Sequence, residues 1–185
     1  MTAPKTQRLF FALWPDPAVR RRLAETATAV AAGARGRWIP AERLHITLLF
    51  LGNVTAETRN AIESAMDSVA AAPFDIVLDR LGFWPRSRVV WMGANKVPAE
   101  LLHLYQALAS AVAGCGASLE TRPYQPHLTL MRDARHPPAE KTPAPVAWRV
   151  ASFALVASEN DAAGTGYRVL RTWPLTAAGG PGSRC

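Results

Sequence analysis

Two tetrapeptides with the pattern His-x-Thr-Leu occur in this 185-residue chain, at His45–Leu48 and His127–Leu130. The chain has only 4 histidines. Its composition predicts about 0.03 copies of the pattern by chance. The two copies begin 82 positions apart, close to half the length of the chain. The repetition therefore indicates a functional pattern rather than an accidental one.

Each tetrapeptide is typical of a strand, where side chains alternate between two faces. The histidine and the threonine, two residues apart, share one face, and the leucine points to the opposite, apolar face. Two such strands facing one another would place two imidazoles and two hydroxyls around a small anion. One neutral imidazole can accept a proton while the other, protonated, donates one, because the ordinary pKa of histidine lies near neutrality. This arrangement favours phosphoryl chemistry without a metal, with the threonine hydroxyls on the phosphate oxygens.

A cation near the second copy would stabilise the negative charge that develops in such a reaction. Arg132 follows Thr129 by three residues, and strict alternation places the two side chains on opposite faces. Arg132 therefore needs a strand end or a β-bulge to reach the site.

Other kinds of site find less support. A single histidine on a half-buried strand is more often structural than catalytic, but the repetition reverses that preference for His45 and His127. Zinc would need a further Cys, His or carboxylate ligand, which neither tetrapeptide supplies. The chain has no G-x-S-x-G, Walker A or dinucleotide-binding pattern. The sequence therefore predicts no metal and no cofactor.

Alternating strands and helices must position these residues. Apolar patterning and caps predict a helix from Pro17 to a stop at Gly33, one capped by Thr55 and ending near Pro73, and one from Pro98 to Gly114. A turn at Gly164–Gly166 joins the last two strands as a hairpin. We expect one domain over residues 1–176 and a disordered tail over 177–185. Strands are expected over residues 9–14, 44–51, 74–81, 89–92, 128–131, 148–157 and 167–175.

The composition is 49% hydrophobic and the formal net charge is +7, which favours one packed core and an anionic partner. All but three of the 21 basic residues are arginines, which suit phosphate contacts, although a compositional bias of the genome is an equal explanation. The cluster Arg20–Arg22 is interpreted as a solvated helix face rather than an RNA-binding one. Two cysteines exclude a disulfide framework. The apolar run over residues 9–14 is too short to cross a membrane, so we expect a cytoplasmic protein.

At its two tetrapeptides the chain resembles the two-histidine phosphoesterase superfamily, and in particular bacterial RNA 2′,3′-cyclic phosphodiesterases, also called 2′-5′ RNA ligases. The segments Trp38–Gly52, Leu81–Pro85, Trp91–Gly93 and Pro126–Arg132 carry the narrower resemblance. The resemblance implies an α+β, bilobal fold. Two antiparallel β-sheets with pseudo-two-fold symmetry would line a central cleft, with the helices on the outside.

The resemblance also implies metal-independent hydrolysis of RNA or nucleotide 2′,3′-cyclic phosphates to 2′-phosphomonoesters. Carried over, His45 is the proton donor and His127 the proton acceptor, while Thr47, Thr129 and Arg132 bind the phosphate. The implied partner is an RNA or nucleotide with a 2′,3′-cyclic end, with no obligatory protein partner. ATP-independent 2′-5′ RNA ligation at the same site and a non-catalytic RNA-binding module remain alternatives.

Two aromatic residues are weaker candidates for the substrate site. Phe11 and Tyr124 would stack on a base, since every base has a π-face. Packing in the core or in the cleft wall is an equal alternative for both.

Overall fold

The computed structural model describes residues 5–30, 35–116, 122–138, 142–161 and 164–176. The predicted helix stop at Gly33 and the predicted tail at 177–185 lie outside these ranges. The helices are α1 (Pro17–Val30), α2 (Ala56–Met66) and α3 (Ala99–Ala113), with a 3-10 turn η1 (Ala41–Arg43). The strands are β1 (Gln7–Leu13), β2 (Arg37–Trp38), β3 (Ile46–Val54), β4 (Phe74–Leu78), β5 (Arg80–Trp84), β6 (Val89–Gly93), β7 (Leu128–Arg132), β8 (Val146–Val150), β9 (Ser152–Asp161) and β10 (Gly164–Pro174).

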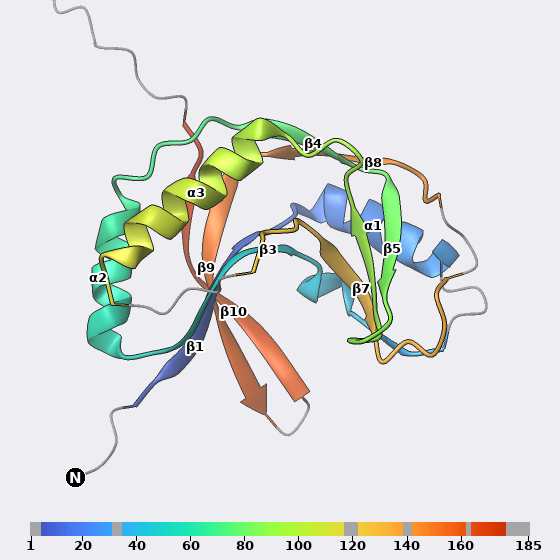
Figure 1. The fold of residues 1–185 in the computed structure, drawn as a ribbon, viewed down its shortest axis with the longest axis horizontal. Coiled ribbons are helices and arrows are strands. Elements are labelled where there is room, and N and C mark those ends of the chain that lie inside the picture. Colours follow the sequence, from blue (N-terminus) through green and yellow to red (C-terminus); the bar gives the residue numbers. More distant parts are fainter. Residues whose placement is uncertain (1–4, 31–34, 117–121, 139–141, 162–163, 177–185) are drawn as a thin grey trace, which may run out of the picture.

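An eight-stranded antiparallel sheet in the order β10-β9-β1-β3-β7-β6-β5, with β2 on β7, forms the centre of the fold (Figure 1). The strands β4 and β8 form a second, two-stranded sheet. The strands β3 and β7, which follow the two histidines, pair directly through Ile46 and Leu128. The α+β class with two antiparallel sheets is confirmed. The strands divide unevenly between the two sheets. The pairing of β3 with β7 joins the strands around the first tetrapeptide and those around the second into the one larger sheet.

Helix α1 begins where its cap predicts. The Asp16 carboxylate accepts hydrogen bonds from the backbone N–H groups of Ala18 and Val19, at 2.8 and 2.9 Å, which satisfies N–H groups that the helix leaves unpaired. The predicted apolar stripe is buried: it consists of Val19, Leu23, Ala27 and Val30. The half-buried Arg20 donates to the backbone carbonyl of Pro15, and the exposed Arg22 donates to that of Ala147.

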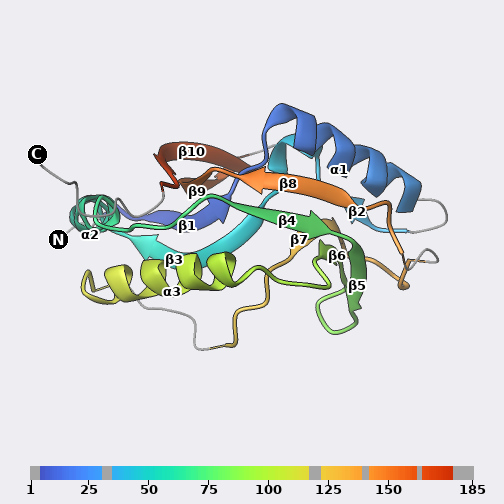
Figure 2. The same cartoon turned by 90° about the horizontal axis from the view of Figure 1, so that it is seen from above.

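Helices α2 and α3 also follow their sequence signals at the start. The Thr55 hydroxyl accepts from the backbone N–H of Thr58 at 3.3 Å and caps α2, which ends at Met66 and not near Pro73. Pro98 occupies the N-cap of α3, and the helix ends before Gly114 as predicted. Figure 2 shows α1 and α3 on either side of β4 and β8, and all three helices pack into one core cluster with the larger sheet.

A single large cluster of buried apolar side chains joins all three helices to β1, β3, β7 and β9. A smaller cluster, with Phe10, Ala12, Ala154 and Val156, lies on the opposite face of β1 and β9. None of the helices in the described ranges is long and apolar enough to cross a membrane.

Three strand predictions need correction. The segment 148–157 contains parts of two strands, because β8 pairs with β4 while β9 pairs with β1 and β10. The segment 74–81 likewise divides between β4 and β5 at Asp79, where the chain changes sheet. A one-residue change of sheet does not interrupt an apolar pattern, so the sequence could not show it. The predicted hairpin is present, but Gly164–Gly166 belong to β10 rather than to its turn.

Candidate active site

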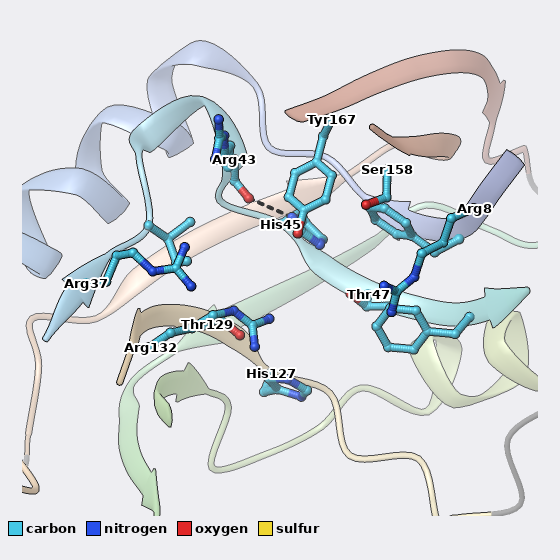
Figure 3. Close-up of a pocket in the computed structure, with 13 residues that line it drawn as sticks. Arg8, Arg37, Arg43, His45, Thr47, His127, Thr129, Arg132, Ser158 and Tyr167 are labelled. Atoms are coloured by element: carbon cyan, nitrogen blue, oxygen red, sulfur yellow. Dashed lines mark hydrogen bonds between the residues drawn. The ribbon is translucent and has the colours of Figure 1, made fainter. Parts of the chain in front are cut away.

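A pocket of about 440 Å³ opens on the polar face of β3 and β7 (Figure 3). It brings together the five residues that the sequence placed around the phosphate: His45, Thr47, His127, Thr129 and Arg132. The other lining residues are Arg8, Phe10, Arg37, Ile39, Arg43, Phe50, Ser158 and Tyr167.

A β-bulge follows each tetrapeptide threonine. In β7 the partner of Trp91 is Thr129, but the partner of Val90 is Met131, so Leu130 is an extra residue. The bulge interrupts the alternation, and Leu130 and Met131 are both buried. Arg132 therefore returns to the face of Thr129, three residues earlier, as the predicted bulge requires.

Strand β3 repeats this irregularity at the equivalent position. Ala12 pairs with Thr47 and Phe11 pairs with Leu49, so Leu48 is the extra residue. Phe50 then shares the pocket face with Thr47, as Arg132 does with Thr129. The two strands thus present the same series of positions to the pocket, but the third position is an aromatic ring in one and a cation in the other.

The two imidazoles are held in the same way. The Nδ1 atom of His45 lies 2.6 Å from the Arg43 carbonyl oxygen, and Nδ1 of His127 lies 2.8 Å from the Gln125 carbonyl oxygen. A carbonyl oxygen can only accept, so Nδ1 carries the proton and donates in both rings. Each ring therefore offers Nε2 for proton transfer.

Aromatic rings pack against both histidines. The indole of Trp14 is stacked on the His45 imidazole, with centroids 5.2 Å apart and an interplanar angle of 11°. Phe10 and Tyr167 contact other parts of the same imidazole, at 5.1 and 5.2 Å. On the other side of the pocket, the Trp84 ring meets His127 edge-on at 4.5 Å. These contacts fix the two imidazoles but also shield them from water.

Burial sets the protonation of the two histidines. The pKa of His45 is lowered from 6.5 to about 4, chiefly by desolvation and also by the positive charges of His127 and Arg132, against the raising effect of the hydrogen bond to the Arg43 carbonyl. Desolvation also lowers the pKa of His127, as does Arg132, while the Gln125 carbonyl raises it. Both imidazoles are therefore mostly neutral at pH 7 in the empty pocket. An anion in the pocket would favour protonation of one of them.

Four arginines line the pocket and no carboxylate does: the arginines are Arg8, Arg37, Arg43 and Arg132. Among the described residues, Arg37 is the only one of the four with an ion pair, to Asp133 at 3.5 Å. A pocket with this surplus of positive charge is suited to anions.

The structure does not place Phe11 and Tyr124 in the pocket. Phe11 is 0% exposed and packs against Phe153 and Trp173 in the core. The neighbouring Phe10 faces the pocket instead, because adjacent side chains of a strand point to opposite faces. Tyr124 stacks on Tyr105 at 4.2 Å, and its hydroxyl donates to the Thr47 carbonyl at 3.3 Å. Tyr124 therefore supports the first tetrapeptide from behind, and burial raises its pKa.

Sequence reasoning missed most of the remaining pocket. Phe50 had a signal, since it follows Thr47 at the spacing at which Arg132 follows Thr129. Arg8, Ser158 and Tyr167 had none, because only the order of strands in the sheet, with β1 next to β3 and β9 and β10 beyond it, brings them to the pocket. In the part of the chain that the structure describes, no three His, Cys, Asp or Glu side chains are grouped to hold a metal ion.

The fold and the pocket define a class of α+β proteins in which two His-x-Thr strands meet within one sheet and turn their polar faces to a common pocket. The chain belongs to the 2′-5′ RNA ligase superfamily, whose family model matches residues 14–162.

Relatives named RNA 2′,3′-cyclic phosphodiesterase align with nearly the whole chain. The relative from Escherichia coli is 36% identical over 173 residues, which cover 92% of this chain and 97% of its own. The relative from Thermus thermophilus is 33% identical over 196 residues, covering 96% and 98%. The crystal structure of E. coli LigT complexed with 3′-AMP is similar with a TM-score of 0.87 at 35% identity, over 93% of this chain and 99% of that one.

Proposed function

We propose that this protein hydrolyses RNA or nucleotide 2′,3′-cyclic phosphates to 2′-phosphomonoesters without a metal or other cofactor. The observation that carries the proposal is the matched pair of imidazoles, each with Nδ1 bound to a backbone carbonyl, in one cationic pocket. The names of the E. coli and Thermus relatives support the same reaction. The complex of E. coli LigT with 3′-AMP supports a nucleotide as the kind of ligand.

The reaction needs two proton transfers. Water attacks the phosphorus atom while Nε2 of His127 accepts the water proton. The bond between phosphorus and the 3′ oxygen breaks, and Nε2–H of His45 donates a proton to that oxygen. The products are a 2′-phosphate and a free 3′-hydroxyl, so one water molecule is consumed and the protons balance.

Three further side chains would hold the phosphate during these steps. The hydroxyls of Thr47 and Thr129 donate to non-bridging oxygens, and the Arg132 guanidinium stabilises the charge that accumulates on them. The bulge in β7 supports this assignment, since it returns Arg132 to the pocket face that Thr129 occupies.

The proton on His45 has a physical source in this scheme. Because burial holds the pKa of His45 at about 4 in the empty pocket, the donor form is scarce until an anion binds. A bound phosphate raises the pKa of a nearby imidazole, since opposite charges favour the charged form. Substrate binding would therefore protonate His45 and so generate the form that donates the proton.

Product analysis in EDTA tests the proposal. We expect a nucleoside 2′,3′-cyclic phosphate to yield the nucleoside 2′-phosphate, at the same rate with and without the chelator. Formation of the 3′-phosphate, or turnover only after metal is added, would contradict it.

Ligation is the second candidate, because the same two imidazoles can serve a second nucleophile that attacks the same cyclic phosphate. A 5′-hydroxyl would then replace water as the nucleophile, and His127 would accept its proton. Mixing RNA ends that carry a 2′,3′-cyclic phosphate and a 5′-hydroxyl, without ATP, measures how much 2′-5′ product forms. A non-catalytic RNA-binding role would show binding with a normal salt dependence but no turnover.

We also propose that residues 1–176 work as one domain in the cytoplasm, where RNA substrates are met.

A further inference from the structure

The pocket contains more positive charge than the proposed reaction uses. A cyclic phosphate diester carries one negative charge, and Arg132 lies beside the second tetrapeptide to meet it. Arg37 is paired with Asp133 at 3.5 Å, but Arg8 and Arg43 add two further guanidiniums that have no ion pair within the described part of the chain. Clustered like charges repel one another unless a ligand neutralises them. The surplus indicates a ligand with more than one phosphate.

Arg8 stands apart from the other three. Side chains alternate along β1, so Arg8, Phe10 and Ala12 share the pocket face. Ala12 pairs with Thr47, which marks the position of the reactive phosphate. Arg8 lies four residues away, about 13 Å of strand at roughly 3.3 Å per residue. Once the long arginine side chain is allowed for, this separation matches one nucleotide step rather than a single phosphate group.

Aromatic rings occupy the space between these two positions. Phe10 and Phe50 are strand partners, with ring centroids 6.0 Å apart, and Phe50 is 46% exposed. The pocket therefore runs from the two histidines, past an aromatic floor, to Arg8. Figure 3 shows Arg8 and Ser158 on the opposite side of the histidines from Arg37 and Arg132.

Ser158 completes a site around Arg8. The two residues are direct partners across β1 and β9, so a hydroxyl donor lies beside the guanidinium. Arg8 is exposed, and it makes no ion pair within the described part of the chain. The carboxylate next in sequence, Glu159, is occupied by Arg168 through hydrogen bonds of 2.9 and 2.6 Å. Arg8 is thus available to an anion.

We propose that Arg8 and Ser158 form a second phosphate subsite, which binds the phosphodiester on the 5′ side of the terminal nucleoside of an RNA. The inference rests on the proposed function, because it takes the cyclic phosphate to lie between the two histidines. The guanidinium binds two phosphate oxygens in its planar fork, and the serine hydroxyl donates to one of them. The substrate class is then an RNA end of at least two nucleotides, in preference to a cyclic mononucleotide.

Three cyclic substrates of increasing length test the subsite: a nucleoside 2′,3′-cyclic phosphate, the same compound with a 5′-phosphate, and a dinucleotide with a 2′,3′-cyclic end. The readout is the ratio of kcat/KM for the dinucleotide to kcat/KM for the mononucleoside compound. We expect a ratio of about ten or more in the wild type, since a charge-assisted contact is gained. Arg8→Gln should reduce this ratio about tenfold and Ser158→Ala by less, while Arg8→Lys should retain part of it.

Salt dependence gives a second readout. The plot of log(kcat/KM) against log salt for the dinucleotide has a negative slope. Loss of one phosphate contact in Arg8→Gln should make this slope shallower by about 0.7. Arg149→Gln is the matched control, because Arg149 is an exposed arginine that pairs with Asp75 in the smaller sheet. It removes the same charge far from the pocket and should keep both the ratio and the slope.

The substrates also separate the two sources of a phosphate at this position. If kcat/KM already rises when the nucleoside compound carries a 5′-phosphate, the subsite accepts any phosphate one nucleotide away. If kcat/KM rises only for the dinucleotide, the subsite is specific for the phosphodiester. Equal kcat/KM for all three substrates, or a ratio that Arg8→Gln leaves unchanged, would overturn the inference. If no cyclic substrate is hydrolysed, the proposed function fails. In that case the affinities of the corresponding 2′-phosphates test the subsite. Weaker binding of the dinucleotide 2′-phosphate by Arg8→Gln than by the wild type would support the subsite, and equal affinities would refute it.

Discussion

Replacement of His45 by glutamine should weaken the pH dependence of stability. In the folded protein the pKa of His45 is lowered from 6.5 to about 4 by burial, so the unfolded chain binds a proton more readily than the folded one. The resulting stability is fully present above pH 6.5 and is lost as the pH falls toward 4. The difference is worth about 3 kcal/mol when fully expressed, at about 1.4 kcal/mol per pH unit.

Urea unfolding of wild type and His45→Gln measures this contribution. Between about pH 7.5 and pH 4.5 the free energy of unfolding of the wild type should fall by about 2 to 3 kcal/mol more than that of the variant. The glutamine amide can still donate to the Arg43 carbonyl but does not titrate, so the difference isolates the imidazole. His103→Gln, at an exposed position on α3, is the matched control and should follow the wild type. Parallel curves for wild type and His45→Gln would refute the account of His45 as a desolvated, neutral imidazole.

Other changes follow from the same geometry. Because both imidazoles have lowered pKa values and one must be protonated, kcat/KM for a cyclic nucleotide should fall about tenfold per pH unit above about pH 6.5. A plateau from there to pH 8 would contradict this. Arg132→Gln should lower kcat/KM about 100-fold and Arg132→Lys less, since lysine keeps the charge but not the fork. Equal losses in steady-state assays would argue against bidentate binding. Gly82→Ala should lower the Tm, because a Cβ there would overlap the Trp91 ring. Gly114→Ala, whose Cβ would meet only the Ala111 carbonyl at 3.9 Å, should leave the Tm nearly unchanged. Equal Tm values for Gly82→Ala and Gly114→Ala would contradict the close packing of Trp91 on Gly82.

The histidines, threonines and Arg132 could be predicted to come together because the repeated tetrapeptide is a local signal. Strand alternation placed each His with its Thr, and the spacing of Arg132 required a bulge that the register of β7 shows. The start of α1 at Asp16 and that of α2 at Thr55 were equally local, since a cap is read from a few neighbouring residues.

Pairing across the sheet was beyond the sequence. Arg8, Ser158 and Tyr167 reach the pocket because β9 lies beside both β1 and β10, and no local pattern encodes that order. Phe11 was placed in the pocket instead of Phe10 because the continuous apolar run over residues 9–14 gives no alternation to separate the two faces. The changes of sheet at Asp79, between β4 and β5, and at Ala151, between β8 and β9, were hidden because a single residue does not interrupt the apolar pattern.

The central claim is that two histidines open a cyclic phosphate by paired proton transfer. The most direct test is to follow a nucleoside 2′,3′-cyclic phosphate by phosphorus NMR in EDTA, with the wild type, His45→Ala, His127→Ala and His103→Ala. The account predicts conversion to the 2′-phosphate by the wild type and by His103→Ala, and a loss of about 100-fold to 10,000-fold in kcat for each of the other two variants. Full activity of either His45→Ala or His127→Ala, in a folded protein, would contradict it.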